Sequence, residues 1–137
     1  MIERRALQTA VLLASIAPIW AGVAGVIWGT SFVWLGEGSV DLGSHFRYLS
    51  GVLLGIGLGF ASCVPTIERH MRRYWMLGAI VVLGGLARLA DAIANGLPSA
   101  GHIFGLIMEL GVVPALMVWQ WRYAVRAQLY SGATDAR

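Results

Sequence analysis

Four long apolar stretches separated by short polar segments dominate the sequence. They cover residues 6–28, 46–64, 74–94 and 101–121. Each holds about 20 residues, and a helix that rises 1.5 Å per residue crosses about 30 Å of hydrocarbon at that length. The pattern therefore predicts an all-α integral membrane protein. We expect residues 1–137 to form a single transmembrane domain, a four-helix bundle followed by a polar tail at 122–137.

The composition agrees with this interpretation. Hydrophobic residues make up 58% of the chain and charged residues 12%, whereas soluble domains carry about 25% charged residues. A cleaved signal peptide is the alternative for the first stretch, but signal peptides have a shorter apolar core of about 7 to 15 residues. The segment 29–45, rich in glycine, serine and aromatic residues, is expected to form an interfacial loop or a short amphipathic segment.

The basic residues predict the orientation of the chain. All ten are arginines, and in a four-span arrangement most of them fall on one side: Arg4, Arg5, Arg69, Arg72, Arg73, Arg122 and Arg126. Because basic residues are retained on the cytoplasmic side, both termini are expected to be cytoplasmic. The arginines stand at helix ends without interleaved stacking aromatics, so no nucleic-acid partner is predicted.

Charges within the apolar stretches are the candidate functional groups. Ionisable side chains inside a membrane are costly unless paired, so they mark sites or structural pairs. Arg88 and Glu109 lie at equal distances on either side of the turn at 98–99, and we expect them to pair across the hairpin. Arg47 enters from the same side of the membrane and is expected to reach Asp91.

Helical spacing extends this cluster along two faces. Gly84, Arg88, Asp91 and Asn95 recur on the third stretch, and His102, Gly105 and Glu109 recur on the fourth. Both faces are expected to line one interior cleft. The predicted ligand-binding or buried ion-pair cluster comprises Arg47, Arg88, Asp91, Asn95, His102 and Glu109. Pro114 cannot donate a hydrogen bond to the Leu110 carbonyl, so a free acceptor is expected beside Glu109.

No motif predicts catalysis, a metal or a cofactor. The single cysteine, Cys63, excludes an internal disulfide and a cysteine-rich metal site. No Ser-His-Asp order, phosphate-binding loop or dinucleotide fingerprint is present. Whether the protein is an enzyme therefore stays open, and a non-catalytic role is favoured.

A glycine repeat on the second stretch predicts close helix contacts. Gly51, Gly55 and Gly59 follow one another every four residues, which lets another helix backbone approach. Packing within the bundle is the favoured interpretation. Contact with a membrane protein partner or with a second copy is the alternative, and membrane lipids are the remaining expected neighbours.

Three segments carry a resemblance to a known family. Residues 46–57 (FRYLSGVLLGIG), 84–89 (GGLARL) and 109–111 (ELG) are similar to small bacterial membrane proteins of domain-of-unknown-function family 4345. The resemblance covers about residues 6–121 and includes Arg47, Arg88 and Glu109 as matched positions. It implies a four-helix, multi-pass protein of the bacterial inner membrane without an established activity. In size and span count the chain also resembles DoxX-like membrane proteins, some of which are subunits of quinone-linked enzymes.

Three functional hypotheses follow. The favoured one is a non-catalytic accessory or assembly subunit of a larger membrane complex, because the polar loops are too short to hold a soluble substrate. The second is a binding protein or enzyme for an amphipathic ligand, lipid, quinone-like or sterol-like, in an outer-half pocket. The third is a proton or ion pathway. A subunit should have its charges closed into pairs, whereas a binding protein should show a cavity beside them.

Overall fold

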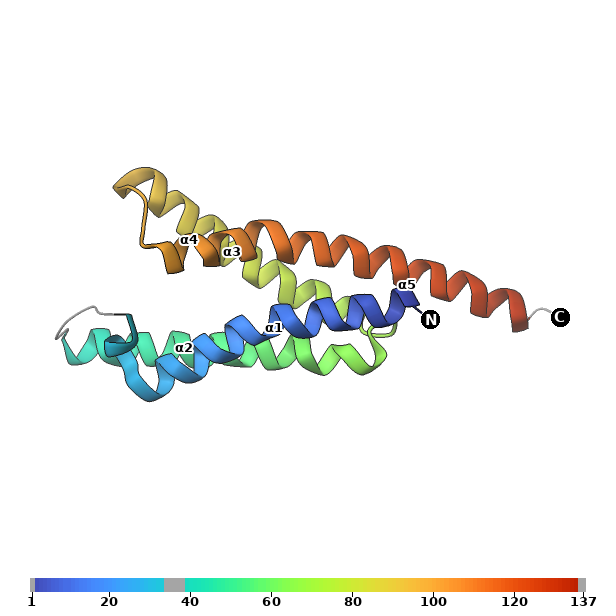
Figure 1. Ribbon diagram of the computed structural model, residues 1–137, viewed down its shortest axis with the longest axis horizontal. Coiled ribbons are helices and arrows are strands. Elements are labelled where there is room, and N and C mark those ends of the chain that lie inside the picture. The colour runs from blue at the N-terminus through green and yellow to red at the C-terminus, as the bar shows by residue number, and fades with distance from the viewer. Residues whose placement is uncertain (1, 34–38, 136–137) are drawn as a thin grey trace.

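Helices account for all the regular secondary structure in the described part of the chain, residues 2–33 and 39–135 of a computed structural model (Figure 1). The segments are α1 (Ile2–Trp28), η1 (Gly29–Val33), α2 (Val40–Cys63), η2 (Val64–Thr66), α3 (Met71–Asn95), α4 (Ala100–Ile107), η3 (Met108–Val112) and α5 (Val113–Asp135). The all-α prediction is confirmed. The fourth predicted span consists of α4, η3 and α5 in succession.

Several helix ends differ from the predicted boundaries. Helix α2 begins at Val40, inside the segment 29–45 that was predicted as an interfacial loop or a short amphipathic segment. Ser39 caps the helix by accepting a hydrogen bond from the Leu42 amide at 3.2 Å. Residues 34–38 of that segment lie outside the described residues. Helix α5 runs on to Asp135, so the predicted polar tail is helical over residues 122–135. The predicted tight turn after α3 is present, and Gly96 begins it at a φ of 101°.

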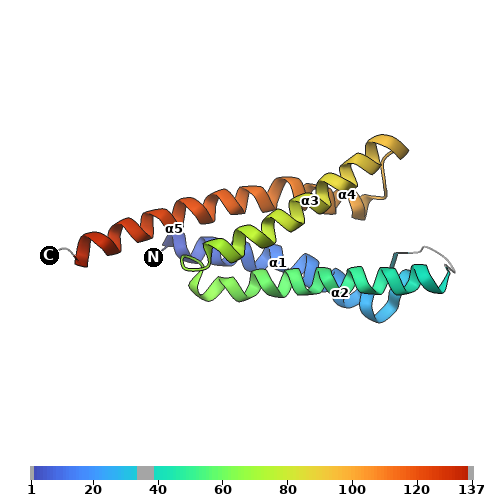
Figure 2. The same ribbon diagram turned by 180° about the vertical axis from the view of Figure 1, so that it is seen from behind.

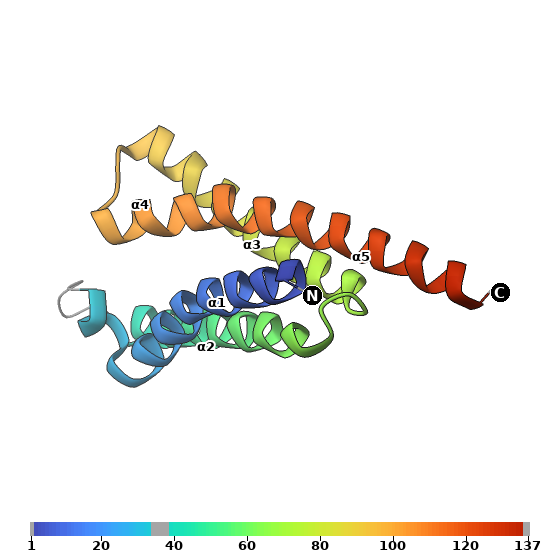
Figure 3. The same ribbon diagram turned by 45° about the vertical axis from the view of Figure 1, so that its right-hand side comes forward.

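Helices α1 and α2 pack against each other along most of their length (Figure 3). Glycines bring the two backbones together. A Cβ atom added to Gly22 would lie 2.6 Å from the Leu54 backbone nitrogen, and one added to Gly57 would lie 2.7 Å from the Ile19 side chain. Small residues permit this approach, and it holds α1 and α2 as one arm of the molecule.

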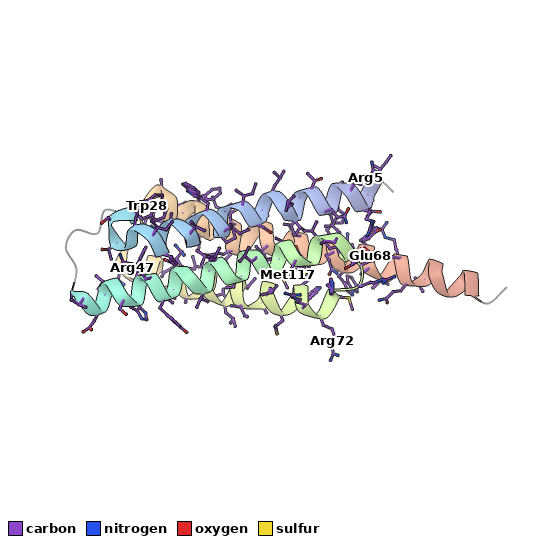
Figure 4. All side chains as sticks on the ribbon, turned by 90° about the horizontal axis from the view of Figure 1, so that it is seen from below. Arg5, Trp28, Arg47, Glu68, Arg72 and Met117 are labelled. Atoms are coloured by element: carbon purple, nitrogen blue, oxygen red, sulfur yellow. The ribbon has the colours of Figure 1, made fainter. Side chains whose placement is uncertain are left out.

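All four predicted spans meet at one end of the molecule, named here the closed end, where the turn 64–70 lies. The buried core there draws on α1, α2, α3, α5 and this turn, through Leu7, Val11, Phe60, Cys63, Ile67, Tyr74, Leu116 and Met117. Phe60 and Tyr74 meet edge to face with ring centroids 5.0 Å apart. Met117 lies between the helices in Figure 4 and packs against Gly78. The hydrophobic core is therefore concentrated in one half of the bundle.

At the opposite end, named here the open end, the two arms diverge. Helix α3 and its partner α4 point away from α1 and α2 in Figures 1 and 2. Within the described residues, α4 packs on α3 and η3 and makes no comparable contact with α1 or α2. The molecule is thus V-shaped, closed at the turn 64–70 and open at the turn 96–99.

The outward surface of the helices is apolar. Four helical regions are long and apolar enough to cross a membrane, and of their most apolar windows only 28%, 22%, 11% and 11% is buried within the described structure. An apolar surface of this extent is not stable in water. The fold is therefore that of a multi-pass membrane protein, and the lipid bilayer supplies the cover that the chain itself does not.

Candidate functional site

Arg88 and Glu109 form an ion pair between α3 and η3. Arg88 Nη2 donates a hydrogen bond to Glu109 Oε1 at 3.2 Å, and Arg88 Nε lies 3.2 Å from Oε2. Arg88 stands about 10 Å from the end of α3 at 1.5 Å per residue, well inside the apolar stretch. The pairing predicted from equal depth on either side of the turn is formed.

Two glycines make room for this ion pair. A Cβ atom on Gly85 would lie 2.8 Å from the Glu109 Cβ atom, so the absence of a side chain lets η3 approach α3 closely. A Cβ atom on Gly105 would lie 3.6 Å from Arg88 Nη1 and 3.9 Å from Glu109 Oε1. Helical spacing predicted Gly84 on this face, but Gly84 has nothing within 4 Å and is exposed. The interface lies one residue further along α3.

Glu109 lies in a turn of π-helix. In η3 the Val113 amide bonds to the Met108 carbonyl five residues earlier, which is wider than the four-residue spacing of an α-helix. Pro114 follows at once and has no amide hydrogen to give to Leu110, so the α-helical ladder is interrupted here in any case. The sequence predicted this interruption but not its form. Such turns are frequent at functional sites.

The two charges of the ion pair compensate each other, but the pair is not fully buried. The Arg88 side chain is 36% exposed and the Glu109 side chain 18%. Glu109 Oε2 is itself buried and has no hydrogen bond to a described residue, although it faces the guanidinium. The charges therefore compensate each other, while part of the arginine remains uncovered by this chain in the region that the bilayer surrounds.

The other predicted members of the cluster on this arm do not join the pair. Asp91 and Asn95 are exposed and bond to each other along α3, with Asn95 Nδ2 donating to Asp91 Oδ1 at 2.7 Å. His102 is also exposed, and its Nδ1 lies 3.0 Å from the Ser99 hydroxyl at the start of α4. The predicted interior cleft lined by both faces is therefore wrong, because these side chains turn outward near the 96–99 turn.

Arg47 belongs to the other arm. Its Nε donates to the Val26 carbonyl at 3.3 Å, in the last turn of α1, and its guanidinium lies against Gly29. The predicted contact with Asp91 is absent from the described structure. The arms diverge before the two residues can meet, and the free carbonyls at the end of α1 offer the cation a partner on its own arm. Arg47 and Trp28 accordingly lie at the same end of Figure 4.

The glycine repeat of α2 divides between two environments. Gly59 faces α3, where an added Cβ atom would lie 3.0 Å from the Leu77 side chain, so this residue serves packing within the chain. Gly51 and Gly55 have nothing within 4 Å and are exposed. Packing within the bundle, the favoured interpretation of the whole repeat, is therefore wrong for these two residues, and their face is free toward the bilayer.

The polar network at the closed end was not predicted. Helix α2 ends at the turn 64–70, where backbone carbonyls lack helical partners. Arg4 Nη2 donates to Pro65 O at 2.8 Å, Gln8 Nε2 to Val64 O at 2.7 Å, and Gln120 Nε2 to Ile67 O at 2.9 Å. Side chains from α1 and α5 thus tie the turn between α2 and α3 into place. The sequence signal that could have predicted this network is the presence of polar residues at the otherwise apolar ends of α1 and α5.

Two ion pairs reinforce this end. Arg4 binds Glu68 with 3.1 Å between Nη2 and Oε1, and Arg126 binds Glu3. Burial raises the pKa of Glu68, but hydrogen bonds and charge attraction from Arg4 outweigh this and leave the pKa lowered. A lowered carboxyl pKa stabilises the fold above the ordinary pKa of the group, and that contribution is lost as the pH falls through the lowered value. Because both side chains are partly exposed, the contribution is about 1 kcal/mol at most.

Fold and site together define a class: multi-pass α-helical membrane proteins with a compensated ion pair inside the apolar region. The chain belongs to the family described as Domain of unknown function (DUF4345), which matches residues 6–120. This confirms the predicted family. No curated protein and no solved structure matches the chain significantly, and the likeness to DoxX-like proteins stays a prediction.

Proposed function

We propose that the protein is a non-catalytic membrane subunit or assembly factor whose open end is covered by transmembrane helices of a partner protein. The observation that carries this proposal is the ion pair of Arg88 and Glu109, which is formed within the chain yet leaves the Arg88 side chain 36% exposed. An arginine facing hydrocarbon is costly, so intramembrane charges normally face protein or water. A neighbouring helix at the open end would supply that cover.

The apolar surface of α3 supports the same proposal. Helix α3 is only 11% buried over its apolar window, and Gly84, one turn from Arg88, leaves its face flat. On α2, Gly51 and Gly55 also leave room for a second backbone. Without a hydrophobic driving force between helices in lipid, close packing at small residues and polar contacts provides most of the attraction. Both arms of the V offer such surfaces.

The proposal includes a location and an orientation. The closed end holds Arg5, Arg69, Arg72, Arg73 and Arg122, which form no ion pair within the described residues. Free basic residues favour the cytoplasmic side. We therefore place the closed end and both termini in the cytoplasm of a bacterium, with the open end toward the outer face of the inner membrane.

A second candidate function rests on Glu109. Its buried Oε2 has no hydrogen bond to a described residue, and the π-turn around it is of the kind that functional sites use. A hydroxyl or amine on an amphipathic ligand would satisfy this oxygen from the open end. The two functions differ in what covers the arginine: a polypeptide in the first and a small molecule in the second.

The test is purification of the tagged protein from its native membrane in mild detergent, with mass spectrometry of co-eluting proteins and bound small molecules. A stoichiometric membrane protein partner that is lost from an Arg88→Gln, Glu109→Gln double variant supports the subunit. A matched Asp91→Asn variant, which changes an exposed carboxylate, should retain the partner. A protein that elutes alone with one enriched amphipathic molecule contradicts the subunit and supports the second function.

A further inference from the structure

Two hollows at the closed end share one tryptophan. The first has a volume of about 410 Å³ and is lined by Trp121, Arg122, Val125 and Arg126. The second has a volume of about 320 Å³ and is lined by Met71, Arg72, Trp75 and Trp121. Trp121 therefore borders both of these shallow, open hollows. Both hollows combine an indole ring with an arginine, and no carboxylate of a described residue lines either one.

The arginines of these hollows are available to bind an anion. Arg72 and Arg122 are exposed and form no ion pair with a described residue. Arg126 is engaged with Glu3 and with the Arg122 carbonyl. Each hollow thus contains one free arginine beside the shared Trp121, namely Arg122 of α5 in the first and Arg72 of α3 in the second. Arginine is well suited to phosphate because its planar fork donates two parallel hydrogen bonds.

Apolar side chains continue from the hollows toward the middle of the molecule. Met76 and Ile80 on α3 are 60% and 45% exposed, and Val118 on α5 is 42% exposed. Trp75 and Trp121 are 39% and 48% exposed and stand at the depth where indole rings anchor at the membrane surface. The surface is therefore basic at the end of the spans and apolar deeper in, which matches the phosphate and acyl chains of a phospholipid.

We propose that the two hollows bordered by Trp121 bind phosphate headgroups of anionic phospholipids, with Arg122 as the free cation of one hollow and Arg72 as that of the other. The acyl chains of these lipids lie on the exposed apolar faces of α3 and α5. Charge complementarity selects an anionic lipid over a zwitterionic one, since a choline group would place a further positive charge beside the arginines.

Reconstitution into nanodiscs of equal parts phosphatidylglycerol and phosphatidylcholine tests this proposal. Native mass spectrometry of the ejected protein measures the ratio of the two retained lipids. We expect phosphatidylglycerol to be enriched, and an Arg72→Gln, Arg122→Gln double variant to lose at least about fivefold more of that enrichment than a variant that lacks two other surface arginines. The matched control is Arg5→Gln, Arg69→Gln, which removes two other exposed arginines of the closed end. Figure 4 shows Arg5 and Arg72 projecting on opposite sides of the molecule.

The outcomes distinguish a defined lipid-binding site from electrostatic attraction of anionic lipids by the whole basic end. Equal retention of the two lipids by the unmodified protein overturns the proposal, and this comparison does not depend on how any variant folds. Equal losses in both double variants also overturn it, because the whole basic end would then act without a defined site. Displacement of phosphatidylglycerol by soluble glycerol 3-phosphate would assign the hollows to a free phosphate ester instead of a lipid.

Discussion

The ion pair of Arg88 and Glu109 combines two opposing effects. Removing two charges from water is expensive, and their mutual attraction repays this cost only with good geometry and further hydrogen bonds. Here one hydrogen bond is made at 3.2 Å and Oε2 has none to a described residue. The pair is therefore not a source of large net stability. Loss of Glu109 alone should destabilise the fold strongly, because a lone guanidinium would then remain inside the apolar region.

A double-mutant cycle on this pair gives the first prediction. Glu109→Gln should destabilise the protein by up to about 3 kcal/mol, because Arg88 keeps its charge and loses its counterion. Adding Arg88→Gln should recover part of this loss, since no charge then remains. Reversible unfolding in mixed micelles measures the free energies of unfolding. Asp91→Asn, on an exposed carboxylate, should change stability by no more than about 0.5 kcal/mol. Strictly additive losses in the double variant would rule out the coupling.

Sequence reasoning succeeded for one pairing and failed for the other for a physical reason. Arg88 and Glu109 flank a single tight turn, so their depths alone fix that they can meet. Arg47 and Asp91 lie on helices that the chain connects through the closed end, so their approach depends on the angle between the two arms. Nothing in residue spacing reports that angle. The free carbonyls of α1 then provided Arg47 with a nearer partner.

At the scale of elements, identical glycines have unlike roles. Gly22 lies where the α1 and α2 backbones touch, whereas Gly51 and Gly55 lie on the far face of α2 with nothing within 4 Å. A four-residue spacing predicts a face free of side chains. It does not predict which neighbour that face contacts. The partner of each glycine became evident only from the arrangement of the helices.

Alanine substitutions should distinguish these roles, because they should lower the stability of the fold at one glycine and raise it at the others. Gly22→Ala should destabilise the chain by about 1 to 3 kcal/mol, because the new Cβ atom meets the Leu54 backbone. Gly51→Ala with Gly55→Ala should raise stability by up to about 1 kcal/mol per site, since alanine favours helix and meets no obstacle. Thermal unfolding of the purified protein, followed by circular dichroism, measures both. Destabilisation by the second pair of substitutions would show that this face is already occupied in the purified protein.

The π-turn shows how far local sequence information reaches. The position of Pro114 predicts a missing hydrogen bond at the Leu110 carbonyl, because proline has no amide hydrogen. The helix responds with a wider turn that carries Glu109, and the stem of Glu109 packs against Gly85 of α3. That contact joins two helices, so it was not available from either helix alone.

At the scale of the whole molecule, the closed and open ends differ in what holds them. The closed end combines the buried core with hydrogen bonds from Arg4, Gln8 and Gln120 to one turn. The open end has capping contacts within each arm and little packing between the arms. Hydropathy predicted four spans correctly because helix length must match bilayer thickness. It carried no information about where along the helices the core would gather.

The central claim is that a partner protein covers Arg88 at the open end. A photoreactive benzoylphenylalanine at Gly84 tests it directly, because this residue is exposed, has nothing within 4 Å and stands one turn from Arg88. Leu13, which is 61% exposed on α1 near the closed end, is the control position. Illumination in the native membrane should crosslink position 84 to a defined membrane protein and position 13 mainly to lipid. Crosslinks to lipid alone from both positions would contradict the proposed subunit.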